Sequence, residues 1–420
     1  GYLAERLASH GYIVVSINAN RVINAADGVT GDDGLNLARG RLILKHLQKL
    51  AEWATNPGTT PDTIGADLSG TIDFAQVGLF GHSRGGEGAR AAYNLYVDNA
   101  SPWPHRIGPR VTFKGIFEVG PVDGQTCRVL DAFGTAWNVI LPMCDGDVRS
   151  LKGMRPFDRM LHASGEAVPS AKGLFAVWGA NHNFYNTEWQ ETDSYQCVGP
   201  DHKKIFEARG RKSLPQQSTA LASAMAFFRG YVGRDADPTY ARLLDPRYAM
   251  PTTFDSITRY ERAFTEAIGS PHEVLVEDFS RDGGIGLHGA REVWAGLSDA
   301  GHCQPFEHPN LAAACLKWES PDAGAYFQST FGSEGSTGID VREYSTFEFR
   351  TSLAEAPAVS PVGYSIQLVN EDGELSKQVK LSDVISLRGP AGHSVLEGVR
   401  IPLADFGNVT PHNVRGVRFS

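Results

Sequence analysis

Three residues that follow apolar runs have the types and the chain order needed for nucleophilic acyl transfer. Ser83 lies in Gly81-His82-Ser83-Arg84-Gly85, a G-x-S-x-G sequence, and Asp145 and His182 come after later apolar runs. A serine hydroxyl is a weak nucleophile until a base takes its proton, and a histidine oriented by a carboxylate is such a base. We therefore predict a triad in which Ser83 is the nucleophile, His182 the general base and Asp145 the acid.

The acid and the base both have competitors in the sequence. Asp147 lies two residues after Asp145 and is the alternative acid, while Asp123, after the preceding predicted strand, is a third option. An aspartate without this role would be a turn-forming or solvated residue. Among the 13 histidines, His182 is in a strand-end loop after a candidate acid. His82 is next to the serine, where we expect its side chain to pack structurally.

The oxyanion of a tetrahedral intermediate must be held by backbone N–H groups. The expected first donor is the amide of Arg84, directly after the nucleophile. The second donor belongs to the loop after an earlier strand, and that loop would lie before Gly1. We therefore expect the first strands of the fold to precede Gly1. The alternative source of the second donor is the Asn18-Ala19-Asn20 loop.

Strands that alternate with helices in the first half of the chain predict an α/β fold with a doubly wound, mostly parallel sheet. The predicted strands are 12–17, 77–80, 113–119, 138–144 and 173–178, and the predicted helices are 2–9, 35–54, 157–163 and 218–232. Catalytic residues of such sheets lie at the carboxyl ends of the strands. The prediction puts Ser83, Asp145 and His182 there.

From about residue 234 the pattern changes to short alternating segments separated by turns, which is typical of an antiparallel β-sandwich. We predict a catalytic domain over 1–233, a linker over 234–271 and a jelly-roll-like β-sandwich over 272–420. The chain stops within an apparent strand at Ser420, so we expect the sandwich to continue beyond it. The predicted strands of this part are 273–279, 325–328, 345–350, 363–369, 377–381, 394–401 and 414–419.

The composition argues against several functions. A net charge of −9 without a dense Lys/Arg run disfavours a nucleic-acid partner, and no apolar stretch is long enough to span a bilayer. The cysteines contain no CxxC pair, which disfavours a zinc site. Their number fits one or two disulfides with a free thiol, or five thiols. The five are Cys127, Cys144, Cys197, Cys303 and Cys315.

Three motifs together resemble the α/β-hydrolase superfamily, and within it the dienelactone-hydrolase, chlorophyllase and cutinase-like serine esterases. They are Gly81-His82-Ser83-Arg84-Gly85-Gly86, Asp145-Gly146-Asp147-Val148 and Gly179-Ala180-Asn181-His182-Asn183-Phe184. The resemblance covers about residues 1–232, and it implies the same triad, the Arg84 amide as an oxyanion donor, and no metal or organic cofactor in catalysis. Residues 272–420 resemble a galactose-binding-like sandwich. That resemblance implies a secreted protein, docking to a carbohydrate or another polymer surface, and a structural calcium.

These observations favour a serine carboxylic-ester hydrolase that works through an acyl-enzyme on a polyester, lipid or other polymer-linked ester. Phe184, Tyr185 and Trp189 follow the base and are expected to line an acyl or aromatic pocket, with core packing as the alternative. An amide or peptide hydrolase would use the same triad. A catalytically silent hydrolase domain in a glycan- or surface-binding protein is the alternative from another class.

Overall fold

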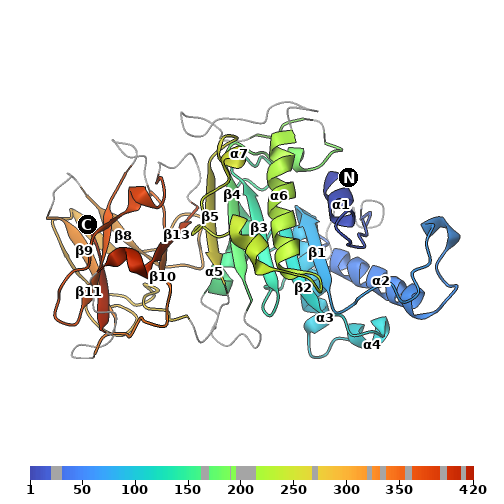
Figure 1. Ribbon diagram of the computed structural model, residues 1–420, viewed down its shortest axis with the longest axis horizontal. Coiled ribbons are helices and arrows are strands. Elements are labelled where there is room, and N and C mark those ends of the chain that lie inside the picture. The colour runs from blue at the N-terminus through green and yellow to red at the C-terminus, as the bar shows by residue number, and fades with distance from the viewer. Residues whose placement is uncertain are drawn as a thin grey trace. The chain divides into compact units, whose positions relative to one another are not determined.

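The protein divides into two compact units, Gly1–Ile268 and Gly269–Ser420, which are drawn in Figure 1. The computed structural model describes residues 1–19, 31–161, 170–189, 191–194, 214–266, 273–318, 324–331, 337–354, 362–387, 395–407 and 413–420. No helix within these ranges combines the length and the apolar character that crossing a membrane requires.

The first unit is built on a mostly parallel sheet in which the described strands follow one another in chain order. The strands are β1 (Val77–His82), β2 (Phe113–Val119), β3 (Ala136–Pro142), β4 (Lys172–Val177) and β5 (Tyr260–Thr265). The first four pair in parallel and β5 pairs antiparallel to β4. Every residue of β3 and β4 is buried, as expected of parallel strands with both faces covered.

Helices cover both faces of this sheet (Figure 1). The helices are α1 (Tyr2–Ala8), α2 (Asn36–Thr55), α3 (Arg84–Val97), α4 (Trp103–Ile107), α5 (Arg155–Leu161), α6 (Leu214–Tyr231) and α7 (Thr252–Asp255). Successive strand residues point to opposite faces. In β2 the ring of Phe117 contacts Phe227 of α6, while Glu118 pairs with Arg90 of α3. α6 and α3 therefore lie on opposite faces.

The predicted buried strand at residues 12–17 is wrong. This segment has no strand structure, and the side chains of Ile13, Val14 and Val15 are 51%, 38% and 44% exposed. A β-branched run forms a strand only where a neighbouring strand completes its hydrogen bonds. Among the described residues, no strand pairs with this segment.

The predicted linker at 234–271 is also wrong over most of its length. It contains α7, a short 3-10 helix at Pro238–Leu243, and β5, which completes the sheet next to β4. Buried and half-buried residues alternate along β5, which is the pattern of a strand with one covered face. The boundary between the units consequently lies after Ile268 rather than after residue 233. Residues 267–272 lie outside the described ranges.

The second unit consists of antiparallel sheets. Its strands are β6 (Val293–Ala295), β7 (Asp299–Cys303), β8 (Ala313–Lys317), β9 (Tyr326–Thr330), β10 (Thr346–Thr351), β11 (Ser365–Asn370), β12 (Val379–Lys380), β13 (Glu397–Pro402) and β14 (Val414–Phe419). The described sheets have the orders β12-β11-β14-β9-β6, β10-β13 and β7-β8. One core unites Ile366 and Leu368 of β11 with Val399 and Ile401 of β13, so strands of two different sheets share it.

The predicted strand at 273–279 is absent from the second unit. The carboxylate of Glu277 accepts hydrogen bonds from the backbone amides of Asp278, Phe279 and Leu287. Such bonds from a side chain to nearby amides compete with the ladder of a sheet, and Phe279 has a φ of 54° that does not fit a strand. The short strands β6, β7 and β8 were not predicted.

Candidate active site

Ser83 lies in a strained turn between β1 and α3. Its φ of 58° and ψ of −128° fall in a region that residues with a side chain rarely occupy. The turn brings Gly81 so close to Gly85 that a Cβ on Gly81 would lie 2.1 Å from the Gly85 carbonyl oxygen. A Cβ on Gly85 itself would meet no atom within 4 Å. The turn therefore requires a small residue at Gly81 and not at Gly85.

His182 and Asp145 come together at the ends of two neighbouring strands. Asp145 follows β3 and His182 follows β4, and His182 Nδ1 lies 2.8 Å from Asp145 Oδ2. Both side chains are fully buried. The other carboxylate oxygen of Asp145 accepts from the backbone amides of Asp147 and Val148 at 2.9 and 2.6 Å. These bonds fix the carboxylate, and the carboxylate in turn orients the imidazole.

The turn that carries Ser83 lies beside this pair. The Ser83 amide donates to the carbonyl of Val119 at 3.0 Å. The next residue, Gly120, has a φ of 46°, and a Cβ there would lie 3.1 Å from His182 Nδ1 and 3.2 Å from Asp145 Oδ2. The ring of His82 lies 4.5 Å from the ring of His182, between centroids. The structure thus brings all three predicted triad residues to the same edge of the sheet.

The second ring nitrogen of His182 faces away from Asp145. His182 Nε2 is buried and has no hydrogen-bond partner among the described residues. Burial by itself lowers the pKa of His182, but the hydrogen bond and charge of Asp145, with the charges of Asp147 and Asp193, raise it above its usual value. His82 behaves in the opposite way, since burial and the nearby His182 lower its pKa to about 3. A neutral His82 adds no charge next to the base.

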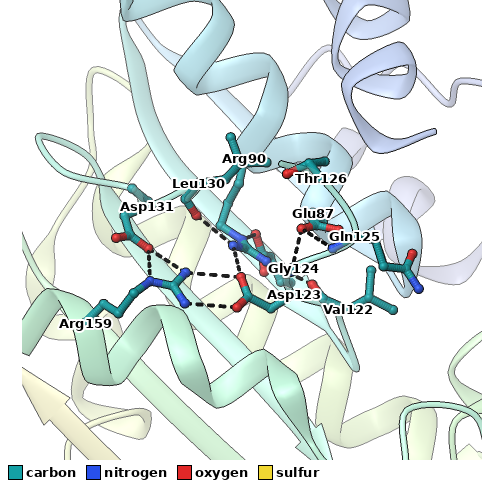
Figure 2. A network of polar contacts seen from close by, with 12 residues as sticks. Glu87, Arg90, Val122, Asp123, Gly124, Gln125, Thr126, Leu130, Asp131 and Arg159 are labelled. Atoms are coloured by element: carbon teal, nitrogen blue, oxygen red, sulfur yellow. Dashed lines mark hydrogen bonds and ion pairs between the residues drawn. The ribbon is translucent and has the colours of Figure 1, made fainter. Parts of the chain in front are cut away.

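The two alternative acids occupy different places. Asp147 Oδ2 lies 3.5 Å from His182 Nε2, the nitrogen that faces away from Asp145, and its side chain is 66% exposed. The orienting position on Nδ1 therefore belongs to Asp145. Among the described residues, Asp123 makes no hydrogen bond or ion pair with the imidazole of His182. Its two carboxylate oxygens are bound by Arg90 and Arg159 instead (Figure 2).

The helix after Ser83 holds the loop that follows β2. Arg90 of α3 is fully buried and pairs with Glu118 of β2 at 2.8 Å and with Asp123 at 2.9 Å. Its remaining N–H groups donate to the carbonyl oxygens of Leu130 and Val122 (Figure 2). Five donors in a rigid fork allow one arginine to bind all of these acceptors. The loop 120–131 is thereby fixed against α3.

Two further side chains extend this network. Arg159 of α5 bonds both Asp123 and Asp131. Glu87, one turn before Arg90 on α3, accepts from the backbone amides of Gly124 and Gln125 at 2.8 and 3.2 Å (Figure 2). The loop that contains Gly120, against which the His182 ring lies, is therefore held from both ends.

The predicted pocket residues separate into two groups. Phe184 and Tyr185 are buried in the core of the first unit with residues of α6, so core packing accounts for them. Their burial favours the core-packing alternative over a role in lining a pocket. Trp189 is 45% exposed, and its ring lies 5.9 Å from that of His182 and 5.6 Å from that of His82. It is the aromatic residue of the three that a ligand at the base would contact.

The expected first oxyanion donor, the amide of Arg84, lies at the start of a helix. Arg84 is the first residue of α3, and the first amides of a helix have no acceptor within the helix. The amide of Arg84 also lies at the positive end of the helix dipole, which favours a negative charge there. Asn20, one of the residues considered for the second donor, lies outside the described ranges.

Comparison with known proteins identifies no family. No protein-family model and no curated protein matches the chain. Among solved structures, a crystal structure of a family 30 carbohydrate binding module matches with a TM-score of 0.24 and 14% identity, covering 30% of this chain and 68% of that chain. A second crystal structure of a family 30 carbohydrate binding module matches with a TM-score of 0.26 and 13% identity, covering 35% of this chain and 88% of that chain. Scores this low carry no argument about fold or ligand.

The cysteines pair in part. Cys303 and Cys315 form a disulfide that joins β7 to β8, and Cys144 is also disulfide-bonded. Cys127 is a free, exposed thiol, and Cys197 lies outside the described ranges.

In the part of the chain that the structure describes, no group of three or more His, Cys, Asp or Glu side chains is placed to hold a metal ion. The calcium site stays a prediction.

Sequence reasoning missed the residues that hold the triad loops. Gly120 lies against the His182–Asp145 pair. Asp193 accepts from the amides of Gly146 and Asn183. These residues belong to no motif, and the contacts join positions 10 and 47 residues apart. The glycine directly after β2 was the one available signal, because a glycine at a strand end often marks a required positive φ.

Proposed function

We propose that the protein is a serine carboxylic-ester hydrolase of the α/β-hydrolase type, with Ser83 as nucleophile, His182 as base and Asp145 as acid. The observation that carries the proposal is the buried 2.8 Å hydrogen bond between Asp145 and His182, beside the strained turn that presents Ser83. A histidine with a carboxylate on one nitrogen and a free second nitrogen is the arrangement that activates a serine.

In the proposed reaction Ser83 Oγ attacks the ester carbonyl carbon while its proton passes to His182 Nε2. The amide of Arg84 donates to the oxyanion of the tetrahedral intermediate. When the intermediate collapses, the ester C–O bond breaks and the leaving alcohol takes the proton from His182. Water, deprotonated by His182, then attacks the acyl-enzyme, releases the acid and restores Ser83.

The substrate class proposed is a polyester, lipid or other polymer-linked ester. The support is the exposed Trp189, whose ring lies next to that of His182, and the presence of a second compact unit made of antiparallel sheets. We further propose that this second unit is a jelly-roll-like sandwich that binds carbohydrate or another polymer surface, holds a structural calcium and belongs to a secreted protein. Parallel assays of an ester and an anilide distinguish this ester hydrolase from the two alternatives, a peptide hydrolase and a catalytically silent domain.

We expect the protein to hydrolyse short-chain p-nitrophenyl esters and to leave the matching p-nitroanilides intact.

His182 acts as a base only when neutral, and its pKa lies above the usual 6.5. Hence kcat/KM should fall as the pH decreases, with its half-maximum above pH 6.5. The Asp145→Asn variant removes the hydrogen bond and charge that raise this pKa, so its acid limb should move to lower pH and its rate should fall about 10⁴-fold.

Three results would contradict parts of this proposal. Cleavage of the anilide in preference to the ester would indicate a peptide hydrolase. No cleavage of either compound would indicate a silent domain. A pH profile without an acid limb above pH 6.5 would exclude His182, in its described environment, as the base.

A second expected result concerns Gly120. The Gly120→Ala variant should lose between about 10- and 100-fold in kcat/KM, because the added Cβ would displace the imidazole and carboxylate that it approaches within 3.2 Å. Gly124→Ala is the matched control, since Gly124 in the same loop has a φ of 84° and no atom within 4 Å of the Cβ position. Both variants should lose about 1–2 kcal/mol of stability from backbone strain. Equal activity in the two variants would contradict the described packing.

A further inference from the structure

One carboxylate joins the two loops that carry the acid and the base. Asp193 Oδ2 accepts from the backbone amide of Gly146 at 2.9 Å, and Asp193 Oδ1 accepts from that of Asn183 at 3.0 Å. Gly146 directly follows Asp145 and Asn183 directly follows His182. A carboxylate that accepts backbone N–H groups forms charge-assisted hydrogen bonds, which are shorter and stronger than neutral ones.

The contact between these segments is close. A Cβ on Gly146 would lie 1.7 Å from the backbone carbonyl oxygen of Asp193, so only glycine allows the two backbones to meet here. The side-chain amide of Asn183 donates to the carbonyl of Glu191 at 3.0 Å. The segment around Asp193 is thus bonded to both loops, and its carboxylate is not a surface group that happens to lie nearby.

The base is held on its other side by α6. The amide of Asn181 donates to Gln216 Oε1 at 3.2 Å, and Gln216 Nε2 donates to the carbonyl of Asn181 at 2.6 Å. Both residues are fully buried. His182 therefore lies between two anchored neighbours, Asn181 bound by Gln216 and Asn183 bound by Asp193. The Asp193 bond is the one that also reaches the acid loop.

We propose that Asp193 is a positioning residue, whose carboxylate fixes the acid loop and the base loop relative to each other and so keeps His182 aligned for proton transfer. This inference rests on the proposed function, since it assigns Asp193 a part in the same reaction. Among the described residues, the Asp193 carboxylate makes no hydrogen bond to Ser83 or to the imidazole of His182. It therefore acts through the backbone of Gly146 and Asn183.

The charge of Asp193 provides a second, measurable effect. The charged groups that face Asp193 are Asp145 and His182. Burial and the charge of Asp145 raise the pKa of Asp193, and the two amides together with His182 oppose that rise. In return, the negative charge of Asp193 raises the pKa of His182, alongside the larger effect of Asp145 and that of Asp147. Removing the charge should lower the pKa of the base.

The test is the Asp193→Asn variant of the full chain. Asparagine has the same shape, but its NH₂ group cannot accept from an amide, so one of the two loop bonds is lost together with the charge. Glu188→Gln is the matched control, because Glu188 is an exposed carboxylate nearby in sequence whose side chain has no hydrogen bond among those described. Rates are expressed per folded protein, with the folded fraction of each variant taken from its circular dichroism spectrum, which removes any misfolded fraction from the comparison.

We expect Asp193→Asn to lower kcat between about 10- and 100-fold and to change KM less than about twofold. Its acid limb should move to lower pH, and Glu188→Gln should match the parent in all three quantities. If Asp193→Asn keeps the kcat and the acid limb of the parent, or if Glu188→Gln loses as much kcat as Asp193→Asn, the inference is overturned.

If the parent cleaves no ester, the proposed function fails, and an NMR titration of the His182 ring then decides alone. A lower pKa of His182 in Asp193→Asn supports the inference, and an unchanged one overturns it.

Discussion

The Ser83→Ala variant is expected to lose ester hydrolysis by a factor of about 10⁴ or more, with almost no change in stability. Alanine removes the hydroxyl that attacks the carbonyl but keeps the Cβ, so the backbone of the turn at φ 58° is as strained as before. The measurement is turnover of a p-nitrophenyl ester next to a thermal melt of the same sample. A melting temperature that falls with the activity would show that Ser83 serves the fold instead.

The Ser83→Gly variant is the matched control for strain. Glycine also lacks the hydroxyl, so turnover should be lost to the same extent. Because glycine occupies the observed φ of 58° and ψ of −128° without a steric penalty, we expect the free energy of unfolding to rise by about 1 kcal/mol. A loss of stability in Ser83→Gly would contradict the strained turn. Strain of this kind persists only where the surrounding structure imposes it, and here Gly81 and the Ser83–Val119 hydrogen bond do so.

The Arg90→Met variant is expected to lose about 3–5 kcal/mol of the free energy of unfolding. Arg90 is fully buried and is bonded to Glu118 and Asp123, which are buried themselves. Figure 2 shows its bond to Asp123. Methionine fills a similar volume but leaves both carboxylates without this cation, and an uncompensated buried charge is far more costly than a lost surface pair. Urea-induced unfolding of the full chain measures the change.

Arg234→Met is the control for Arg90→Met. Arg234 pairs with Asp73 at 2.7 Å, but its side chain is 83% exposed. A pair in water contributes little, so the midpoint of unfolding should not change measurably. Similar effects of the two substitutions would contradict the structural importance of the buried network. A large loss of activity in Arg90→Met protein that is still folded would in addition indicate that the loop 120–131 positions His182.

Local motifs made the sequence prediction of the triad possible. A glycine-flanked serine and two polar residues at strand ends can be recognised from a few neighbours each, and the structure brings Ser83, Asp145 and His182 to one edge of the sheet. The mostly apolar segment of β2 and the segment of β14 were predicted with the bounds that the structure has, 113–119 and 414–419. In these strands local propensity and tertiary context agree.

The wrong predictions at 12–17 and at β5 share a physical cause, which is that a strand depends on its neighbours. The run 12–17 has strand propensity but no adjacent strand among the described residues. β5 has an ordinary composition, yet it forms because the edge of β4 is open to it. Gly120, Asp193 and Gln216 were missed for the same reason, since their roles come from contacts with residues distant in the chain.

Covalent labelling by a fluorophosphonate, with the modified residue located by mass spectrometry, tests whether Ser83 is a nucleophile that His182 activates. The reagent reacts with a serine only where a base activates it, and it requires no knowledge of the substrate. We expect stoichiometric modification of Ser83 in the parent protein and none of that serine in the His182→Ala variant. An unmodified Ser83 in folded parent protein, or equal modification in His182→Ala, would contradict it.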